Sequence, residues 1–486
     1  MGFSKTSLSL LLLSFHILFS SSDATSRIPH RQLFQKTPTF SPNQQVNIIH
    51  GDSVDFVPGK MVEKNFSFLG GSDKPSIENL GHHAGYYSLP SSNSARMFYF
   101  FFESQNNTRD DPVVIWLTGG PGCSGEIALF YENGPFHISD KSQLVPNNYS
   151  WNKASNIIFV DQPIGTGFSY TLDDNDYSRD VTSISNYLYD FLQEFFKQHP
   201  DFVKNDFYIT GESYAGQYIP ALASRVRQGN KDSEGIHINL KGIAIGNGMT
   251  NPLIQYPSLP QYAVDMKLIT KEDQDQINKL IPPCEDAIKS CESEGGDSCF
   301  TALTQCNDIM KNILSIAGGI NYYDIRTQRD GELCYDFTPV ETFLNDDSVK
   351  KALGVLEDLY FLACGRLANN KLIRARMNNF EDDIPALLED GIKVLIYAGE
   401  YDLICNWLGI SKWVHAMEWS GQKQFADSKT VPFLVDGAQA GSLNSYGLLS
   451  FLKVKGAGHM VPMDQPKAAF QMFVNWLDGT LNERSV

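Results

Sequence analysis

The stretch that most constrains the fold of this 486-residue chain is GESYAG, at 211–216. It follows an apolar run at 207–209 and precedes a segment with helical character at 217–226. A buried strand, a sharp turn and a helix are therefore predicted in that order. Small residues around Ser213 suit a strained turn that pushes the serine hydroxyl out above a sheet. Ser213 is the candidate nucleophile, and an ordinary Gly-Ser turn is the alternative that partner residues must exclude.

The first residues of the chain predict passage through the secretory pathway. Residues 1–24 combine a short polar start, an apolar run at 8–19 and small residues at the end, the pattern of a signal peptide. A membrane anchor is the weaker alternative, because the apolar run is shorter than the ~20 residues that span a bilayer. We therefore expect a vacuolar or extracellular protein, glycosylated at three Asn-X-Ser/Thr sequons, Asn65, Asn106 and Asn148.

Residues 25–75 are polar and lack a sustained period, so we expect a propeptide or leader without a packed element. The remainder, 76–486, is expected to form one catalytic domain with an inserted subdomain. A formal net charge of −17 argues against nucleic acid or an anionic membrane as a partner. After removal of the signal peptide, we expect no membrane association.

A glycine-rich loop, TGGPGCSG at 118–125, directly follows another apolar run at 113–117. Its adjacent glycines leave backbone N–H groups unshielded, which suits an oxyanion hole. A phosphate-binding loop is the weaker interpretation, because the P-loop lysine and the spacing G-x-G-x-x-G are absent. Together with the serine turn, this loop predicts the α/β-hydrolase fold, a mixed and mostly parallel sheet flanked by helices. The oxyanion donors would then be Gly120 and Tyr214.

The remaining apolar runs extend the same pattern. A Pro- and Gly-punctuated loop, DQPIGTGFSY at 161–170, follows one of them and is expected to line the site at the same sheet edge. Residues 182–198 have the spacing of a helix that packs beside the sheet. Further strands are predicted at 97–102, 157–160, 241–246, 394–397 and 451–454.

The partners of a nucleophilic serine are sought downstream, in the order acid and then histidine. The segment AGEYDLICNW follows the strand at 394–397 and offers Glu400 and Asp402, of which we choose Asp402, although the sequence separates them only weakly. Two histidines follow. His415 lies in a helix-like run, where packing is the expected role, whereas His459 lies in GAGHMVP directly after a strand and is the predicted base.

Between 251 and 346 the strands stop, and we expect an inserted helical cap that carries five of the eight cysteines. Two pairs in this cap have members seven residues apart, which places each pair on one face of a helix. An antiparallel helical hairpin would join Cys291 with Cys299 and Cys284 with Cys306. A zinc site is disfavoured by the signal peptide and by the absence of C-x-x-C spacing.

Five ordered motifs closely resemble those of the serine carboxypeptidases, peptidases of the α/β-hydrolase fold. They are WLTGGPGCSG, DQPIGTGFSY, GESYAG, AGEYDLICNW and GHMVPMDQP, and the resemblance runs from about Leu80 to the end of the chain. The segments FYENGPF, at 130–136, and SYGLLSFLKV, at 445–454, are similar to those of plant vacuolar or secreted members. The resemblance implies release of C-terminal residues from peptides and proteins at acidic pH. It also implies that no metal or cofactor is needed and that the protein is a monomer or homodimer.

The resemblance assigns Ser213, Asp402 and His459 as the catalytic triad, with Gly120 and Tyr214 as the oxyanion donors. It adds a substrate-binding pair of carboxyls, Glu132 and Glu212, which share a proton and hold the substrate's C-terminal carboxylate. The N–H of Gly119 joins them, and so does residue 118, where the usual asparagine is Thr118 here. Thr118 keeps a hydroxyl but loses a planar amide. Gly125 likewise replaces a common serine.

The resemblance also implies a disulfide between Cys123 and Cys364, and a free thiol near the site at Cys405. Similar proteins carry a cysteine just upstream of the position of Cys334, whereas this chain reads RTQRDGELCY there. Cys334 is therefore predicted to be unpaired.

Three other functions were weighed against the peptidase. Some plant relatives transfer acyl groups from glucose esters, but these tend to have aspartate before the nucleophile, so Glu212 favours peptide hydrolysis. An intact triad disfavours a non-catalytic binding or stabilising protein. A metallocarboxypeptidase is excluded, because the sequence contains no H-E-x-x-H or comparable His/Glu cluster.

Overall fold

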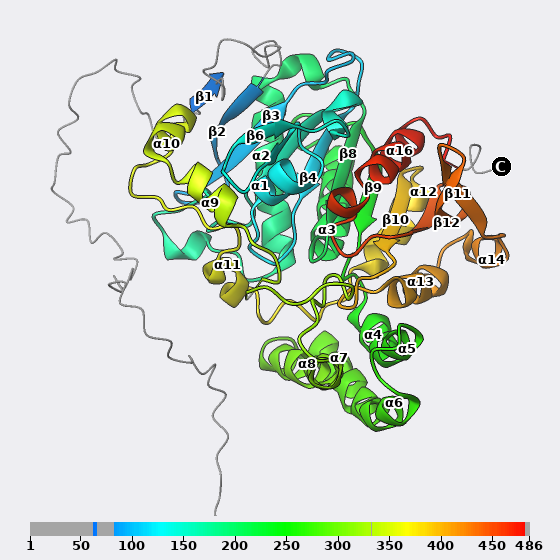
Figure 1. The fold of residues 1–486 in the computed structure, drawn as a ribbon. Helices are drawn as coiled ribbons and strands as arrows, with labels where there is room; N and C mark the ends of the chain where they lie inside the picture. Colours follow the sequence, from blue (N-terminus) through cyan, green and yellow to red (C-terminus); the bar gives the residue numbers. More distant parts are fainter. Residues whose placement is uncertain (1–61, 66–81, 332, 482–486) are drawn as a thin grey trace, which may run out of the picture. The chain divides into compact units, whose positions relative to one another are not determined.

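An eleven-stranded sheet runs through the computed structural model, which describes residues 62–65, 82–331 and 333–481 (Figure 1). The predicted signal peptide and most of the predicted propeptide lie outside these residues. Across the sheet the strands are β1 (Val62–Asn65), β2 (His82–Ser88), β3 (Arg96–Phe102), β7 (Asn156–Val160), β4 (Val113–Leu117), β8 (Phe207–Glu212), β9 (Leu240–Gly246), β10 (Lys393–Gly399), β13 (Leu449–Val454), β12 (Ala438–Tyr446) and β11 (Val431–Val435). A separate hairpin pairs β5 (Phe136–Ile138) with β6 (Leu144–Pro146).

Neighbouring strands from β7 to β13 are parallel, and the pairs at both edges of the sheet are antiparallel. Every residue of β4, β7 and β8 is buried, as expected for parallel strands covered on both faces. Alternate residues serve two separate cores. Ile115 packs into one of them, while Val114 and Trp116 pack into the other.

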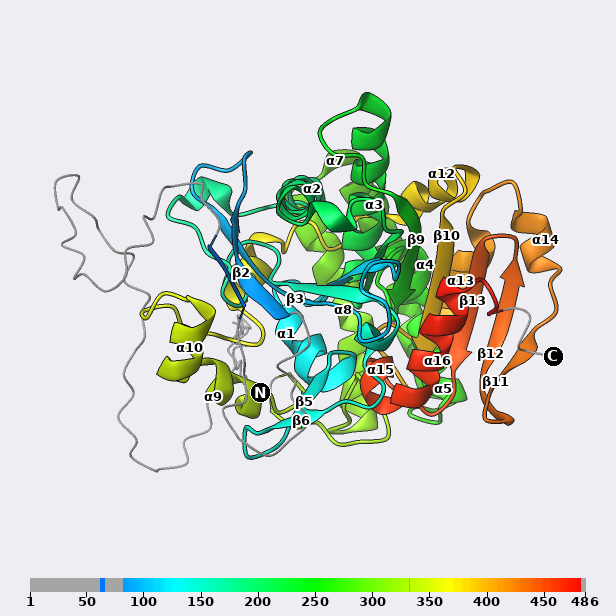
Figure 2. The ribbon, with the colours of Figure 1, turned by 90° about the horizontal axis from the view of Figure 1, so that it is seen from above.

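Helices supply the opposite walls of these two cores (Figure 2). On the Ile115 face lie α2 (Val181–Gln198), α3 (Ala215–Asp232), α12 (Ile384–Glu389), α13 (Trp407–Ala416) and α14 (Gln422–Ala426). On the Trp116 face lie α1 (Gly125–Ile127), α9 (Thr338–Leu344), α10 (Asp347–Leu353), α15 (Val461–Asp464) and α16 (Pro466–Leu477). The α/β-hydrolase arrangement predicted from the sequence is therefore confirmed.

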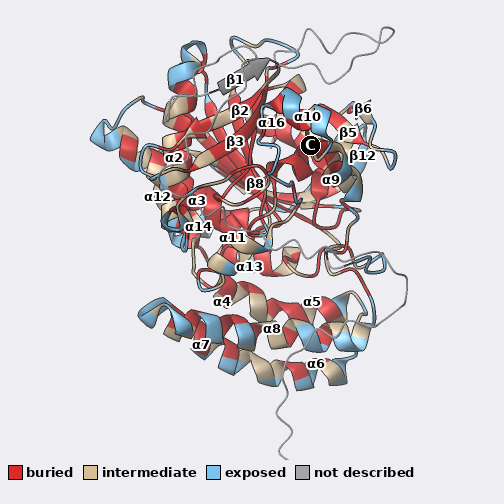
Figure 3. Ribbon diagram, turned by 90° about the vertical axis from the view of Figure 1, so that its left-hand side faces the viewer, coloured by how far each residue is buried: buried red, intermediate tan, exposed pale blue. Residues whose placement is uncertain are grey.

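The connection from β9 to β10 contains the helical cap, which has a hydrophobic core of its own. Its helices are α4 (Pro252–Gln255), α5 (Leu259–Asp265), α6 (Lys271–Ile277), α7 (Ile281–Glu294) and α8 (Asp297–Ala317), and α11 (Arg366–Lys371) follows further along. Figure 3 shows buried and exposed residues alternating along α6, α7 and α8, whereas the strands of the sheet are buried. The cap is narrower than the predicted 251–346, because Val340 and Leu344 of α9 pack against the sheet.

Single helical turns connect the longer elements. A π-helical turn spans Ala128–Glu132, and 3₁₀ turns span Trp151–Lys153, Asp174–Asp176, Pro200–Phe202, Tyr256–Ser258, Asn278–Leu280 and Glu381–Asp383. Among the described residues, no helix is both long and apolar enough to cross a membrane.

One segment differs from the sequence prediction. Residues Val62–Asn65, within the stretch predicted to lack a packed element, pair antiparallel with β2 as the edge strand of the sheet. The pattern of four residues is too short to register as a strand by periodicity, and the pairing depends on a partner twenty residues away. Of the three sequons, Asn106 and Asn148 lie on exposed surface, and Asn65 falls in β1, where side chains are outside the described features.

Three disulfides cross-link the described chain, and they join the pairs expected from the sequence. Cys284–Cys306 and Cys291–Cys299 tie α7 to α8, and Cys123–Cys364 ties the glycine-rich loop to the segment before α11. Cys334 and Cys405 are free and buried.

Peptide mapping without reduction should therefore recover these three linked pairs. Alkylation of the native protein should leave Cys334 and Cys405 unmodified, because each side chain is only 3% exposed, and both should react after unfolding in denaturant. A cross-linked Cys334–Cys405 peptide would contradict this assignment.

Candidate active site

Ser213 lies on a tight turn between β8 and α3, with a backbone φ of +63°. Few non-glycine residues adopt this left-handed conformation, and here three hydrogen bonds maintain it. The Ser213 N–H donates to the Gly246 carbonyl at 3.0 Å, and its own carbonyl accepts from Gly216 and Met249, each at 3.0 Å. A Cβ at Gly211 would lie 2.1 Å from the Leu117 carbonyl oxygen, which explains the small residue before the turn.

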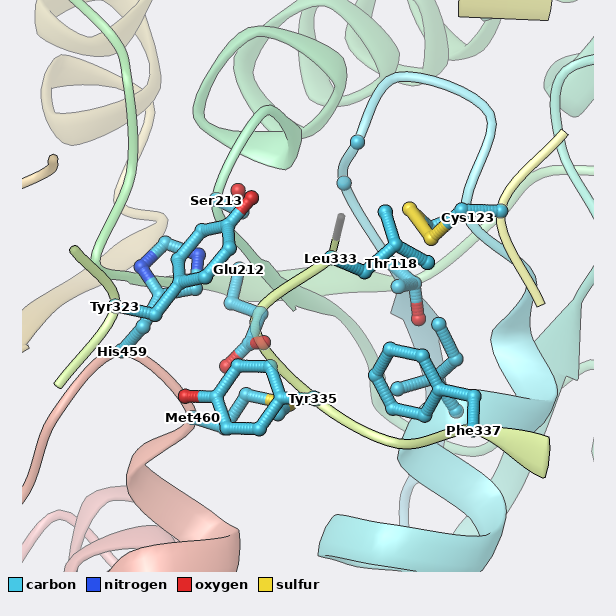
Figure 4. Close-up of a pocket in the computed structure, with 14 residues that line it drawn as sticks. Thr118, Cys123, Glu212, Ser213, Tyr323, Leu333, Tyr335, Phe337, His459 and Met460 are labelled. Carbon is cyan, nitrogen blue, oxygen red and sulfur yellow. A yellow bond between two sulfur atoms is a disulfide. The ribbon is translucent and has the colours of Figure 1, made fainter. Parts of the chain in front are cut away.

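His459 and Asp402 form a buried pair beside this turn. His459 Nδ1 lies 2.7 Å from Asp402 Oδ2, and the two side chains are 4% and 0% exposed. When Nδ1 carries the ring proton and donates it to the Asp402 carboxylate, Nε2 is left as the acceptor for a serine hydroxyl. His459 and Ser213 both line one pocket (Figure 4). The structure thus brings the three predicted triad residues together at the carboxyl ends of β8, β10 and β13.

The two alternatives left by the sequence have other contacts. Glu400 accepts the Gly456 N–H at 3.3 Å and lies 3.8 Å from Lys453 Nζ, away from His459. His415 lies on α13, where its Nδ1 is 2.7 Å from the Ser411 carbonyl oxygen. Neither residue lines the pocket that contains Ser213.

Asn247 supports Asp402 and was not predicted. Its Nδ2 donates to Asp402 Oδ2 at 2.8 Å, while its Oδ1 accepts the Gly399 N–H at 3.1 Å. The Ile404 N–H donates to the other carboxylate oxygen at 3.1 Å. Asn247 directly follows β9, so its place at the carboxyl edge of a parallel strand was the signal available in the sequence.

The glycine-rich loop packs tightly against the serine turn. A Cβ at Gly119 would lie 2.5 Å from the Tyr214 backbone nitrogen and 2.7 Å from the Ser213 Cβ. Gly120 has a φ of +108°, which strongly favours glycine. The Cys123 N–H closes the loop by donating to the Gly119 carbonyl at 3.2 Å. The predicted oxyanion donors, Gly120 and Tyr214, therefore belong to two backbone segments in direct contact.

Two buried carboxyls lie below the serine. Glu212 is the last residue of β8, and Glu132 is the last residue of the π-helical turn. Burial raises the pKa of Glu132 to about 8, although the hydrogen bond it shares with Glu212 lowers that value. Burial, followed by the charge of Glu132, raises the pKa of Glu212 well above its usual range. The pair therefore holds a proton at acidic and neutral pH.

The pocket combines this polar floor with an apolar wall, around an empty volume of about 470 Å³ (Figure 4). Its lining includes Thr118, Gly119, Gly120, Glu212, Ser213 and His459 of the predicted set. The sequence reasoning missed the apolar wall, formed by Ile127, Tyr323, Leu333, Tyr335, Phe337 and Met460. The backbone carbonyl of Tyr323 accepts the backbone N–H of His459 at 2.8 Å. The Tyr323 and His459 ring centroids lie 4.8 Å apart.

Two departures from the family pattern and one predicted loop can now be placed. The Thr118 hydroxyl accepts from Trp116 Nε1 at 3.2 Å, so its own proton is available to a ligand in the pocket. At Gly125 a Cβ would lie 2.9 Å from Val160 backbone atoms, so this chain has no room for a side chain there. The loop 161–170 supplies no lining residue among those described. It packs behind the glycine-rich loop instead, and its predicted place in the site wall is wrong.

One group of described side chains has the spacing of metal ligands. One ligand atom each from Asp402, Cys405 and His459 lie within 4.8 Å of one another, and all three residues are buried. The acid and the imidazole already use these atoms in their mutual hydrogen bond. Burial, with Asp402 and Glu212 nearby, raises the pKa of the Cys405 thiol well above its usual range, which keeps it a neutral thiol.

Comparison with known proteins agrees with this geometry. The family model described as serine carboxypeptidase matches residues 72–479. The chain belongs to the serine carboxypeptidase family. Serine carboxypeptidase-like 48 of Arabidopsis thaliana is 58% identical over 449 residues, which cover 91% of this chain and 87% of that protein. Serine carboxypeptidase 3 of Oryza sativa subsp. japonica is 59% identical over 433 residues, covering 89% and 86%.

A solved structure shows the same fold. The crystal structure of KEX1(delta)p, a prohormone-processing carboxypeptidase from Saccharomyces cerevisiae, has a TM-score of 0.76 and 27% sequence identity. The match covers 83% of this chain and 93% of that one. As a member of the family, this chain is a serine-type hydrolase.

The raised pKa values of Glu132 and Glu212 predict that this pair favours the fold more in acid than in alkali. A carboxyl with a raised folded-state pKa binds more protons in the native than in the unfolded chain, so its stabilisation is lost as pH rises toward the folded value, about 8 for Glu132. The free energy of unfolding should therefore fall between pH 5 and pH 8, with a contribution on the order of 3 kcal/mol from the Glu132–Glu212 pair.

Urea unfolding at several pH values measures this loss. In Glu132→Gln the fall should be smaller than in the wild type, because the amide does not titrate. Parallel stability curves for the two proteins across this range would contradict the assignment.

Proposed function

We propose that this chain removes single residues from the C-termini of peptides by acyl transfer to Ser213. The observation that carries the proposal is that Glu212, which is buried beside Glu132, lines the pocket that also contains Ser213 and His459, while Glu132 lies behind it and does not line the pocket. A protonated carboxyl can donate a hydrogen bond to a substrate's terminal carboxylate, which an internal peptide bond does not offer. Such a floor selects the last peptide bond of a chain.

The geometry supports a two-step reaction. His459 Nε2 takes the proton of the Ser213 hydroxyl as the oxygen attacks the last peptide carbonyl, and Asp402 stabilises the resulting imidazolium. Asn247 and the Ile404 N–H fix Asp402 so that its Oδ2 stays on the imidazole. The backbone N–H groups of Gly120 and Tyr214 would stabilise the developing oxyanion. His459 then protonates the leaving amine, and water hydrolyses the acyl-enzyme by the same path.

The pocket further suggests which C-terminal residues are released. Its wall is made of aromatic and aliphatic side chains, and among the described residues that line it the ionisable side chains other than the wall's tyrosines are Glu212 and His459, at the reacting end. Burying a hydrophobic side chain there releases apolar surface from water, whereas a charged side chain would lose hydration without a partner. Peptides that end in bulky apolar residues are the proposed substrates.

The cross-links and the predicted signal peptide support a proposal for the cellular location. Three disulfides fit an oxidising compartment, as does the predicted signal peptide at 1–24. We therefore place the protein in the secretory pathway, in the vacuole or outside the cell. Extracts fractionated into vacuoles and cell wall, probed for the tagged full chain, would distinguish the two, and a cytosolic signal would refute both.

Ser213→Ala should lower kcat/KM for an N-blocked dipeptide by roughly 10⁴-fold or more. Wild type should release phenylalanine or leucine from such dipeptides more efficiently than lysine. Released amino acid is measured for each C-terminal residue, with a glucose-ester donor as the arm that detects acyl transfer. Activity of the alanine variant equal to that of the wild type would end the serine-peptidase proposal, and turnover of the glucose ester alone would favour the acyltransferase.

The carboxyl pair predicts a pH effect confined to substrates with a free C-terminus. As pH rises past about 8, Glu132 loses its proton and the pair then repels a substrate carboxylate, so KM for a free-acid dipeptide should increase. KM for the matching dipeptide amide should not. In Glu212→Gln the difference between the two substrates should flatten, because glutamine remains a neutral donor. Parallel wild-type KM profiles for acid and amide would rule out the pair as the carboxylate anchor.

A further inference from the structure

A second pair of buried carboxyls lies outside the reaction described above. Glu126, in α1, is 1% exposed, and Asp161, directly after β7, is 0% exposed. The Ser124 hydroxyl donates to Glu126 Oε2, and the Glu126 carboxyl also shares a side-chain hydrogen bond with Asp161. Among the described residues, neither carboxyl forms an ion pair with a lysine, arginine or histidine. Two acids are therefore buried together without a compensating cation.

This pair joins the glycine-rich loop, which the proposed mechanism uses, to the loop 161–170 that packs behind it. Asp161 Oδ1 accepts the Gly125 N–H at 3.2 Å from the glycine-rich loop, and Oδ2 accepts the Phe168 N–H at 2.7 Å from its own loop. The fit leaves no free space, because a Cβ at Gly167 would lie 2.1 Å from Asp161 Oδ2. Along the chain, Glu126 lies between Gly120, the proposed oxyanion donor, and Glu132, the proposed carboxylate anchor.

The hydrogen bonds decide which acid carries the proton. Two backbone N–H groups point at Asp161 and favour its charged form. Glu126 receives only the Ser124 hydroxyl and its own turn, so burial and the neighbouring Asp161 charge keep it protonated. The protonated Glu126 carboxyl can then donate a hydrogen bond to the Asp161 carboxylate, in addition to the two backbone N–H groups that Asp161 accepts. A proton, in place of a cation, holds the two carboxyls together.

The surroundings offer no other charge to replace that proton. The titratable group facing the pair from β2 is Tyr86, whose hydroxyl is buried and whose pKa is raised by burial, by Tyr170 and by both acids. Arg96 acts on Tyr170, one residue further out, and its Nη1 donates to the carbonyls of Ser94 and Ala95. If Glu126 ionised, two adjacent carboxylates would repel each other in a site closed to water.

We propose that Glu126 is a positioning residue for the reaction, whose proton, shared with Asp161, keeps the glycine-rich loop and the Gly120 N–H in place for catalysis. This inference rests on the proposed function, because it acts through the oxyanion donor. At alkaline pH the Glu126 proton leaves to solvent, the carboxylates separate, and the Gly125–Asp161 contact loosens. Turnover then falls even for a substrate whose C-terminus has no charge.

The test measures kcat against pH with an N-blocked dipeptide amide. This substrate has no terminal carboxylate, so titration of Glu132 and Glu212 does not change its binding through charge repulsion. Glu126→Gln keeps a neutral donor in place of the protonated acid, and its alkaline decline in kcat should move up by about one pH unit or more. Asp161→Asn removes the second carboxylate, so ionised Glu126 meets no like charge and the alkaline decline of this variant should also move up. Reassay at pH 5 separates this reversible decline from irreversible unfolding.

Upward shifts from both neutralising substitutions are not expected of residues that only fill space. Glu341→Gln is the matched control, because its carboxylate supports the same loop region by accepting the Ala363 N–H at 2.9 Å but has no carboxyl partner. Its pH profile should coincide with that of the wild type.

If either variant fails to fold, pH-difference infrared spectroscopy of the wild type and the folding variant provides a second measurement. The carbonyl band of a buried protonated carboxyl should disappear at alkaline pH in the wild type, and one such band should be missing in Glu126→Gln. The inference would be overturned if the alkaline declines of both variants coincided with that of the wild type, or if the carbonyl bands were unchanged by pH and by Glu126→Gln. Either result would leave Ser213-dependent peptide release intact. Loss of that release in the wild type would instead refute the proposed function.

Discussion

Removal of carboxyl groups from water is the constraint on which the site depends. Glu212, Glu132, Glu126 and Asp161 are all buried at or near the carboxyl ends of the parallel strands, and burial is the first cause of each raised pKa. Asp402 is equally buried, but it is placed between His459, Asn247 and a backbone N–H that stabilise its negative charge. The difference between these acids is one of hydrogen-bond partners, and it separates Asp402 and Asp161, which accept backbone and side-chain hydrogen bonds, from Glu126, Glu132 and Glu212, which keep a proton to donate.

The parallel sheet explains how acids from distant parts of the sequence meet. Strands β4, β7, β8, β9 and β10 run side by side in one direction, so the residues that follow them emerge at a single edge. The chain needs glycine at this edge because backbone segments approach within contact distance, as Gly119 does against the Tyr214 nitrogen. Because glycine has no side chain to separate the loops, their backbones come into contact and leave no room for water between them.

The sequence was informative where a residue follows a strand and uninformative where packing decides. Ser213, Asp402 and His459 could be predicted because strand ends place them at one edge, although only the contacts of Glu400 with Gly456 and Lys453 separate it from Asp402. Tyr323 and Tyr335 could not, because they lie in an irregular segment whose position depends on the cap. Glu126 could not either, because a glutamate in α1 reads as a solvent-exposed helix residue until Ser124 and Asp161 are seen around it.

The four raised pKa values act in the same direction, and this links stability to function. Glu132 and Glu212 need a proton to anchor a substrate carboxylate, and Glu126 needs one to join its loop to Asp161, so folding favours the protonated form of these acids. The net charge of −17 at pH 7 adds a repulsion that also diminishes as acids take up protons. A pH that assembles the site is therefore also a pH that favours the fold. Lowering the pH therefore acts on the site and on the fold together, because no lysine or arginine among the described residues takes the place of these protons.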